Sequence, residues 1–167
     1  MKTEFDVNIS EKNMFVFLLN NTYRRITGII WIIFSIVIIG VTVYTWGDVK
    51  IQNSILMILL ASLYTVINPL MLYSRARKQI KNNDYFANVL HYIVDEDGVK
   101  VSQNGQDASV KWEEVWKIVR YGNEIAAYVS TDRAFIWPMD SIKDNYNDIV
   151  QMAEEHIGKR CHIRKSV

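Results

Sequence analysis

The sequence predicts a helical membrane hairpin of two spans joined to a cytoplasmic α+β domain. Two uncharged apolar stretches, residues 26–46 and 51–74, each reach the roughly 20 residues that a helix needs to cross a bilayer. Lysine and arginine gather at the ends of these stretches that face away from the short loop 47–50. After residue 88 the chain changes to short runs of β-branched and aromatic residues between turn residues. That pattern predicts an antiparallel β meander of about six or seven strands followed by a C-terminal helix.

Averages over the whole chain conceal this division. With 167 residues, half of them hydrophobic, and a mean hydropathy of 0.00, the composition is that of an ordinary soluble domain. Residues 1–81 carry nine Lys and Arg against four Asp and Glu, whereas residues 82–167 carry ten against fourteen. The basic excess accompanies the apolar stretches, so we expect no nucleic-acid partner.

The distribution of cations indicates the orientation of the hairpin. Arg24 and Arg25 precede the first span, and the loop 47–50 balances one Lys against one Asp. Four more cations follow the second span: Arg75, Arg77, Lys78 and Lys81. Because cytoplasmic flanks carry the excess of Lys and Arg, both termini are expected in the cytoplasm of a multi-pass protein of the cell membrane. The first span starts too late and is too long for a cleavable signal peptide.

The segment 1–25 predicts a strand at residues 3–9 and a helix that Ser10 caps and that runs toward Arg24. In the strand, Phe5, Val7 and Ile9 alternate with polar residues. A lone strand is not stable without a partner. We therefore expect it to complete the cytoplasmic sheet, so that the membrane hairpin splits one domain.

The cytoplasmic domain is expected over residues 89–158, after a basic juxtamembrane linker at 75–88 and before a basic tail at 159–167. Turn pairs such as Asn104-Gly105 separate its strands. The predicted strands cover residues 89–95, 99–103, 107–112, 116–121, 124–130 and 133–137. One helix then begins at Asp140 or Ser141 and ends at Gly158. Its apolar stripe should cover one face of the sheet and consists of Ile142, Tyr146, Ile149, Ala153 and Ile157.

The residues of this region resemble a known family. A short amino-terminal strand and helix, a two-span hairpin, and the runs WEEVWKIV, IAAYVS and AFIWPM are similar to the bacterial YcxB-like membrane proteins. The resemblance covers nearly the whole chain and implies a pleckstrin-homology-like cytoplasmic domain, with no established reaction. The family's usual Pro-Lys-Arg after the third run is here Pro138-Met139-Asp140. Any role of those two cations therefore does not carry over.

Asn68 and Pro69 interrupt the second apolar stretch. Counting back from Tyr73 at about 1.5 Å per residue places Asn68 roughly 7 Å inside the cytoplasmic boundary. Pro69 lacks an N–H and crowds the carbonyl of Thr65, so a kink is expected, with Thr65 and Asn68 satisfying the freed groups. The alternative, an ion or solute site at a broken helix, normally has acidic partners at mid-depth, which both spans lack.

Two groups of residues could suggest catalysis or metal binding. His156, Cys161 and His162 match no zinc spacing with a second ligand pair. Glu113 and Glu114 are adjacent, so they point apart. We expect them to lie in a solvated connection, with the flanking Trp112 and Trp116 packed inward.

No glycine-rich phosphate loop and no nucleophile motif occurs in the sequence, so we expect no enzyme, no cofactor and no metal. The cluster Arg75, Arg77, Lys78 and Lys81 is instead expected to contact anionic lipid headgroups. The resulting hypothesis is an integral membrane protein that presents its cytoplasmic domain for protein binding or membrane sensing. The alternative is a subunit of an oligomeric small transporter or pore. A protein partner on the cytoplasmic domain and a homo-oligomer both stay open.

Overall fold

The structure is a computed structural model that describes residues 1–83, 86 and 88–163. Parts of the predicted linker, residues 84, 85 and 87, and of the predicted tail, residues 164–167, lie outside the described residues. The strands are β1 (Lys2–Val7), β2 (Leu90–Asp95), β3 (Gly98–Gln103), β4 (Gln106–Lys111), β5 (Lys117–Tyr121), β6 (Glu124–Tyr128), β7 (Ala134–Pro138) and β8 (Cys161–His162). The α-helices are α1 (Glu11–Tyr23), α2 (Ile26–Tyr44), α3 (Ile51–Ser62), α4 (Asn68–Asn82), α6 (Met139–Ile142) and α7 (Tyr146–Ile157). The described residues also form the π-helix η1 (Leu63–Ile67) and the 3₁₀-helices η2 (Trp112–Glu114) and η3 (Gly158–Arg160).

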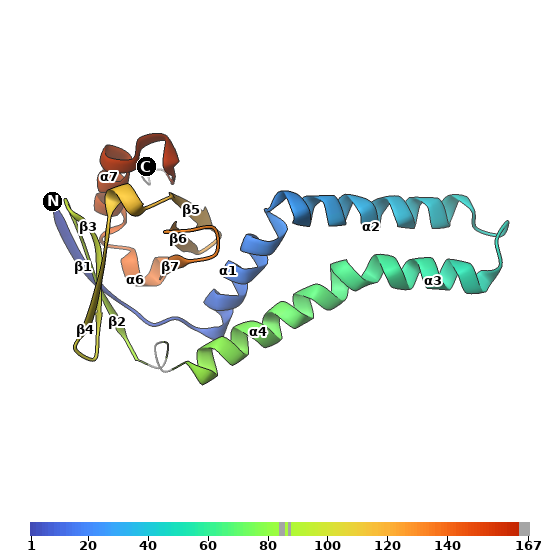
Figure 1. Ribbon diagram of the computed structural model, residues 1–167, viewed down its shortest axis with the longest axis horizontal. Helices are drawn as coiled ribbons and strands as arrows, with labels where there is room; N and C mark the ends of the chain where they lie inside the picture. Colours follow the sequence, from blue (N-terminus) through green and yellow to red (C-terminus); the bar gives the residue numbers. More distant parts are fainter. Residues whose placement is uncertain (84–85, 87, 164–167) are drawn as a thin grey trace.

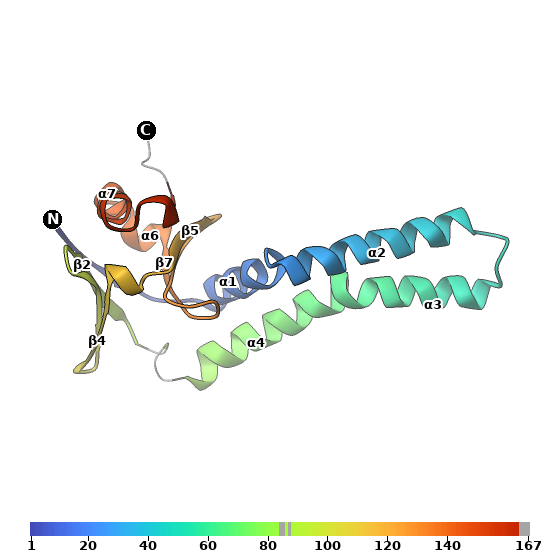
Figure 2. The ribbon, with the colours of Figure 1, turned by 45° about the horizontal axis from the view of Figure 1, so that its top comes forward.

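Two parts are visible in Figures 1 and 2: a domain of strands and short helices, and a long helical hairpin that extends away from it. Within the described residues the strands form two four-stranded sheets, in the orders β1-β2-β3-β4 and β7-β6-β5-β8. The predicted single meander is thus divided between two sheets. The Asn104-Gly105 pair makes the β3–β4 turn, and both residues have the positive φ, 49° and 77°, that such a tight hairpin needs.

The amino-terminal strand lies in the domain. β1 pairs antiparallel with β2, so that Phe5 lies opposite Tyr92 and Val7 opposite Leu90. Phe5, Val7 and Ile9 are buried in the same core as the strands that follow the hairpin. The Phe5 ring stacks on Tyr92 at 5.6 Å between centroids and meets the edge of Trp137 at 5.7 Å. Residues from both sides of the hairpin in sequence therefore form one core.

The carboxy-terminal helix differs from the prediction in one respect. Ile142, Tyr146 and Ile157 are buried as the apolar stripe predicted, and the chain leaves α7 at Gly158 with φ of 52°. The helix is nevertheless divided into α6 and α7. Asn145, between them, uses its side-chain amide to donate to the Glu4 carbonyl of β1 at 2.9 Å. This hydrogen bond fixes the break between α6 and α7 next to β1.

An eighth strand was not predicted. β8 pairs parallel with β5, so that Ile118 lies opposite Cys161 and Val119 opposite His162. A two-residue strand leaves too short a pattern for recognition from sequence, and it lies within the segment that was predicted to be a basic tail.

The prediction that Trp116 packs inward is also wrong. Trp112 is 4% exposed, whereas Trp116 is 45% exposed. The two rings separate because Val115 takes the buried position between η2 and β5.

The helical hairpin consists of two nearly continuous arms, one formed by α1 and α2 and the other by α3, η1 and α4. α2 packs on α3, and α1 packs on α4. The buried residues of α2 and α3 are small and recur at intervals of seven: Gly28, which lies against the last turn of α1, Ser35 and Thr42 on α2, and Ser54 and Ala61 on α3. Small side chains let apolar helices approach closely.

The large apolar side chains of α2 and α3 point outward, and most are about half exposed, for example Ile36 at 63% and Leu59 at 58%. Ile26–Tyr44 and Ile51–Asn82 are each long and apolar enough to cross a membrane.

Candidate functional site

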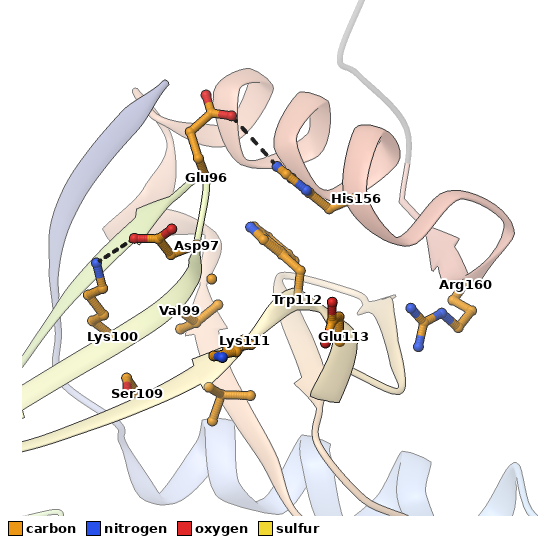
Figure 3. A pocket seen from close by; sticks show the side chains of 12 residues that line it. Glu96, Asp97, Val99, Lys100, Ser109, Lys111, Trp112, Glu113, His156 and Arg160 are labelled. Atoms are coloured by element: carbon orange, nitrogen blue, oxygen red, sulfur yellow. Dashed lines mark ion pairs between the residues drawn. The ribbon is translucent and has the colours of Figure 1, made fainter.

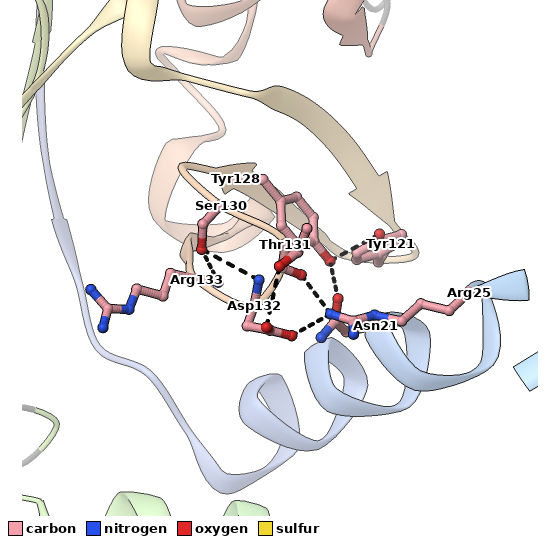
Figure 4. Close-up of polar contacts among 8 residues, drawn as sticks. All are labelled: Asn21, Arg25, Tyr121, Tyr128, Ser130, Thr131, Asp132 and Arg133. Carbon is pink, nitrogen blue, oxygen red and sulfur yellow. Dashed lines mark hydrogen bonds and ion pairs between the residues drawn. The ribbon is translucent and has the colours of Figure 1, made fainter. Parts of the chain in front are cut away.

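The functional features gather where α1 ends and α2 begins, because this junction touches both the domain and the second arm of the hairpin. Arg25 donates to the Thr131 carbonyl at 2.6 Å and forms an ion pair with Asp132 (Figure 4). These two residues belong to the β6–β7 turn, which Val129 closes by donating its N–H to the Arg133 carbonyl at 3.0 Å. Arg25 directly precedes α2, so its contacts join the start of this apolar helix to a turn of the domain. We call this link the Arg25 clamp.

A second set of contacts supports the clamp from inside the domain. The Tyr128 hydroxyl donates to the Asn21 side-chain oxygen at 3.3 Å and lies 3.1 Å from the Tyr121 hydroxyl (Figure 4). Arg25 lowers the pKa of the Asp132 carboxyl through their hydrogen bond. Because the Arg25–Asp132 pair is solvent-exposed, it adds little stability. A weak link of this kind can open and close without unfolding the domain.

The Asn68-Pro69 pair lies at the same level of the hairpin. The chain forms the π-helix η1 immediately before Pro69, with the Asn68 N–H donating to the Leu63 carbonyl. In that pattern the next N–H would reach Tyr64, but Pro69 has none to donate. The Tyr23 hydroxyl donates to the Tyr64 carbonyl instead, at 2.7 Å.

The prediction that Thr65 and Asn68 satisfy the carbonyl freed by Pro69 is therefore wrong, because the Tyr64 carbonyl accepts from Tyr23. Thr65 bonds the Ala61 carbonyl at 3.2 Å, and the Asn68 amide donates to the Tyr23 hydroxyl at 3.3 Å. Asn68 orients Tyr23, and Tyr23 satisfies the backbone. The sequence showed no sign of this role of Tyr23, because Tyr23 precedes Asn68 by 45 residues and lies outside both apolar stretches.

This arrangement predicts unequal effects of two substitutions. Tyr23→Phe removes the donor to a shielded carbonyl and should lower the free energy of unfolding by about 1 to 2 kcal/mol. Asn68→Leu leaves that donor in place and should cost less. Thermal melting of both variants in mild detergent measures the difference. Tyr73→Phe, on an exposed ring of α4, is the control and should melt like the wild type. Equal losses for Tyr23→Phe and Asn68→Leu would contradict the assignment.

The predicted cation cluster is divided by the structure. Arg75 and Lys78 line a groove of about 510 Å³ between α1, α4 and the β6–β7 turn, which we call the α4 groove. Arg25 lines the same groove, although it lies 50 residues earlier in the sequence. Arg77 instead faces Glu11 of α1 at 3.8 Å. Lys81 is exposed on the last turn of α4 and does not line the groove.

The α4 groove suits an anionic group. Its cations line it together with Thr22, Thr27 and Asp132, and the carboxylate of Asp132 pairs with Arg25. Arginine and lysine beside hydroxyl donors are the usual partners of phosphate oxygens.

A buried carboxyl lies where α1 meets the second sheet. Glu124, the first residue of β6, is 2% exposed, and its Oε2 accepts a hydrogen bond from the Asn13 amide of α1 at 3.2 Å. Its Oε1 has no hydrogen-bond partner among the described residues. Burial raises the pKa of Glu124 from 4.5 to about 7. The sequence contained no signal for this group, because nothing around position 124 distinguishes it from a turn residue.

Stability should therefore depend on pH through Glu124. In the folded protein Glu124 keeps its proton up to about pH 7, whereas in the unfolded chain it loses the proton near pH 4.5. The protonated Glu124 therefore contributes its full stabilisation of the folded state below pH 4.5. This stabilisation is lost as the pH rises through 7. The slope is up to about 1.4 kcal/mol per pH unit in that window. Chemical unfolding at several pH values measures it, and Glu124→Gln should flatten the dependence. An unchanged slope in Glu124→Gln would assign the effect to other groups.

A hollow of about 630 Å³ lies between β3, β4 and α7 (Figure 3). The His156 ring stacks on Trp112 at 5.4 Å with 3° between the planes, and its Nε2 lies 3.9 Å from Glu96. Lys100 pairs with Asp97 at 3.5 Å. The charged side chains here pair with one another, and the stacked Trp112 and His156 rings cover the core at this end of the sheets.

The other candidate ligands and acids lie apart. Cys161 is in β8, where burial raises the pKa of its thiol, while His156 faces Glu96. In the part of the chain that the structure describes, no three His, Cys, Asp or Glu side chains form a group able to hold a metal ion. Glu114 accepts a hydrogen bond from the backbone of Lys111 at 3.0 Å and thereby caps η2, while Glu113 is exposed.

Comparison with known proteins agrees with the motifs. The family model described as YcxB-like protein matches residues 94–153, from the end of β2 into α7, and this confirms the resemblance over these residues. No curated protein and no solved structure gave a significant match.

Proposed function

We propose that this YcxB-like chain is a non-enzymatic membrane protein whose pleckstrin-homology-like cytoplasmic domain senses the state of the bilayer through the α1–α2 junction. The observation that carries the proposal is that α1 is shared. Its Met14 and Phe17 are buried in the domain core, while the opposite side packs on α4 through Phe15 and Tyr73, whose centroids lie 5.6 Å apart. A helix that belongs to both parts transmits any movement between them.

The dimensions of the hairpin support a membrane location. α2 has 19 residues, which at about 1.5 Å per residue is close to the roughly 30 Å of a bilayer core. α3 and η1 together match it over Ile51–Ile67. We therefore place the cytoplasmic boundary at the level of Arg25 and Asn68. Residues 69–74, which the sequence assigned to the second span, then lie beside α1.

The domain supports the pleckstrin-homology-like assignment in its architecture. Two antiparallel sheets and a terminal helix enclose one core, with β8 as an addition. α7 covers the open end of the sheets with six buried residues: Tyr146, Ile149, Val150, Met152, Ala153 and Ile157. The positive-inside rule, applied to Arg24, Arg25, Arg75 and Lys78, supports a cytoplasmic location of this domain.

Sensing would proceed through the Arg25 clamp. A change in bilayer thickness alters the tilt of a transmembrane helix. Tilting α2 moves Arg25 relative to the β6–β7 turn, because α1 stays fixed in the domain core. The turn would then open, and the exposed surface of the domain around it would change.

Hydrogen exchange of the β6–β7 turn in the full chain tests this function. The protein is placed in nanodiscs of short-chain and long-chain phosphatidylcholine, and amide exchange over residues 129–133 is compared. We expect a several-fold difference in exchange rate between the two bilayers for the wild type. In Asp132→Asn the turn should exchange fast in both.

Asp107→Asn, on the exposed edge strand β4, is the matched control and should behave like the wild type. Equal exchange of the wild-type turn in thin and thick bilayers would contradict the sensing role.

A further inference from the structure

A second groove lies on the other side of α1 from the α4 groove. It has a volume of about 310 Å³ and runs between the end of α1 and the adjoining ends of β5 and β6. We call it the β5 groove. Three cations line it, Arg24, Arg25 and Lys117, and none of its lining residues is acidic. Such a site favours an anion.

Two of these cations are held by aromatic rings. The Arg24 guanidinium lies 5.2 Å from the centre of the Tyr121 ring. The Lys117 ammonium lies 4.5 Å from the Trp116 ring and 4.9 Å from the Tyr128 ring. Ring contacts position a cation without neutralising its charge. Among the residues the structure describes, no ion pair is formed by Arg24 or Lys117, whereas Arg25 is shared with Asp132.

The groove opens next to the apolar helix. Arg24 and Arg25 directly precede Ile26, the first residue of α2. Trp116 lies at the same end of the domain, because its N–H donates to the Tyr128 carbonyl at 2.7 Å and the Tyr128 hydroxyl reaches Asn21. The Trp116 ring is 45% exposed, and indole rings favour the headgroup region of a bilayer.

We infer that the β5 groove holds the phosphate of an anionic phospholipid headgroup, with Arg24 and Lys117 binding the phosphate oxygens and Trp116 lying among the neighbouring headgroups. This inference rests on the proposed membrane location of α2. The exposed indole beside unneutralised cations favours a lipid over a soluble phosphate, because a soluble ligand would make no use of an apolar ring at the bilayer edge. The domain's net negative charge gave no sign of this local basic site.

Native mass spectrometry of the full chain in mild detergent tests the inference, with phosphatidylglycerol and phosphatidylcholine as probes. The wild type should bind phosphatidylglycerol roughly 30- to 100-fold more tightly than phosphatidylcholine, given two to three cations near the headgroup at about 1 kcal/mol each. The double variant Arg24→Gln/Lys117→Gln should lose most of this preference. The double variant Arg24→Lys/Lys117→Arg keeps both charges and should retain it, which excludes misfolding as the cause.

The matched control is Lys143→Gln/Lys159→Gln, which removes two exposed cations near α7 and should leave the preference unchanged. An equal loss in both Gln pairs, or no loss in either, would overturn the site in favour of diffuse attraction. Displacement of phosphatidylglycerol by equimolar glycerol 3-phosphate would overturn the lipid assignment in favour of a soluble phosphate.

Failure of the lipid site can be distinguished from failure of the proposed membrane location. Membrane topology is measured by labelling that does not involve the β5 groove. If the topology holds and the lipid preference is absent, this inference alone fails. If the hairpin does not cross the membrane, the premise fails with it.

Discussion

Phe5→Ala should lower the free energy of unfolding of the domain by about 3 to 5 kcal/mol, the usual cost of removing a buried phenylalanine. The ring is 6% exposed, stacks on Tyr92 and meets the edge of Trp137, and these two rings also contact one another at 5.9 Å. A small domain is stable by only about 5 to 15 kcal/mol, so this loss should leave the variant marginal. Urea unfolding of the full chain in detergent, followed by tryptophan fluorescence, measures it.

Glu4→Ala provides the matched control on the same strand. Glu4 is exposed and pairs with surface groups, Lys2 at 2.6 Å and His91 at 3.9 Å. Its removal should change the unfolding midpoint little. If Phe5→Ala unfolds at the same urea concentration as Glu4→Ala, β1 is not part of the domain core, and residues 1–9 form a separate segment.

Gly28→Ala should destabilise the α1–α2 junction by about 3 kcal/mol, at the upper end of the cost of overpacking. A Cβ at position 28 would lie 2.3 Å from the Thr22 carbonyl oxygen and 2.8 Å from the Tyr23 Cα. These are backbone atoms, so no side chain can move aside. The last turn of α1 must shift, and the Arg25 clamp shifts with it.

Gly40→Ala is the control, because a Cβ there meets nothing within 4 Å. Alanine normally stabilises a helix relative to glycine, so Gly40→Ala should melt at or slightly above the wild-type temperature. Thermal melting in mild detergent and limited proteolysis near Arg25 compare the two variants. A Gly28→Ala variant that melts like Gly40→Ala would show that the close approach of α1 and α2 is not needed.

Local patterns accounted for most secondary structure. The alternation of Phe5, Val7 and Ile9 corresponds to the buried face of β1, and the apolar stripe of the last helix is buried as expected. What local patterns could not supply were features that arise from tertiary contact. β8 forms because β5 offers a free edge, and the last helix divides because Asn145 bonds β1.

The site was harder to predict because its parts are far apart in the chain. Cations near residue 75 indicated a basic surface, but Arg25 joins Arg75 only through the packing of α1 on α4. Tyr23 and Glu124 act through partners 41 and 111 residues away. The exposure of Trp116 depends on which residue between it and Trp112 enters the core, and Val115 takes that place.

Cysteine labelling in whole cells tests the membrane topology on which the account depends. In a Cys161→Ser background, single thiols are introduced by Asp48→Cys in the hairpin loop and by Asp107→Cys on the exposed strand β4, and each is treated with a membrane-impermeant maleimide. The account predicts that the loop thiol reacts in intact cells and that the β4 thiol reacts only after lysis. Reaction of the β4 thiol in intact cells, or of the loop thiol only after lysis, would contradict it.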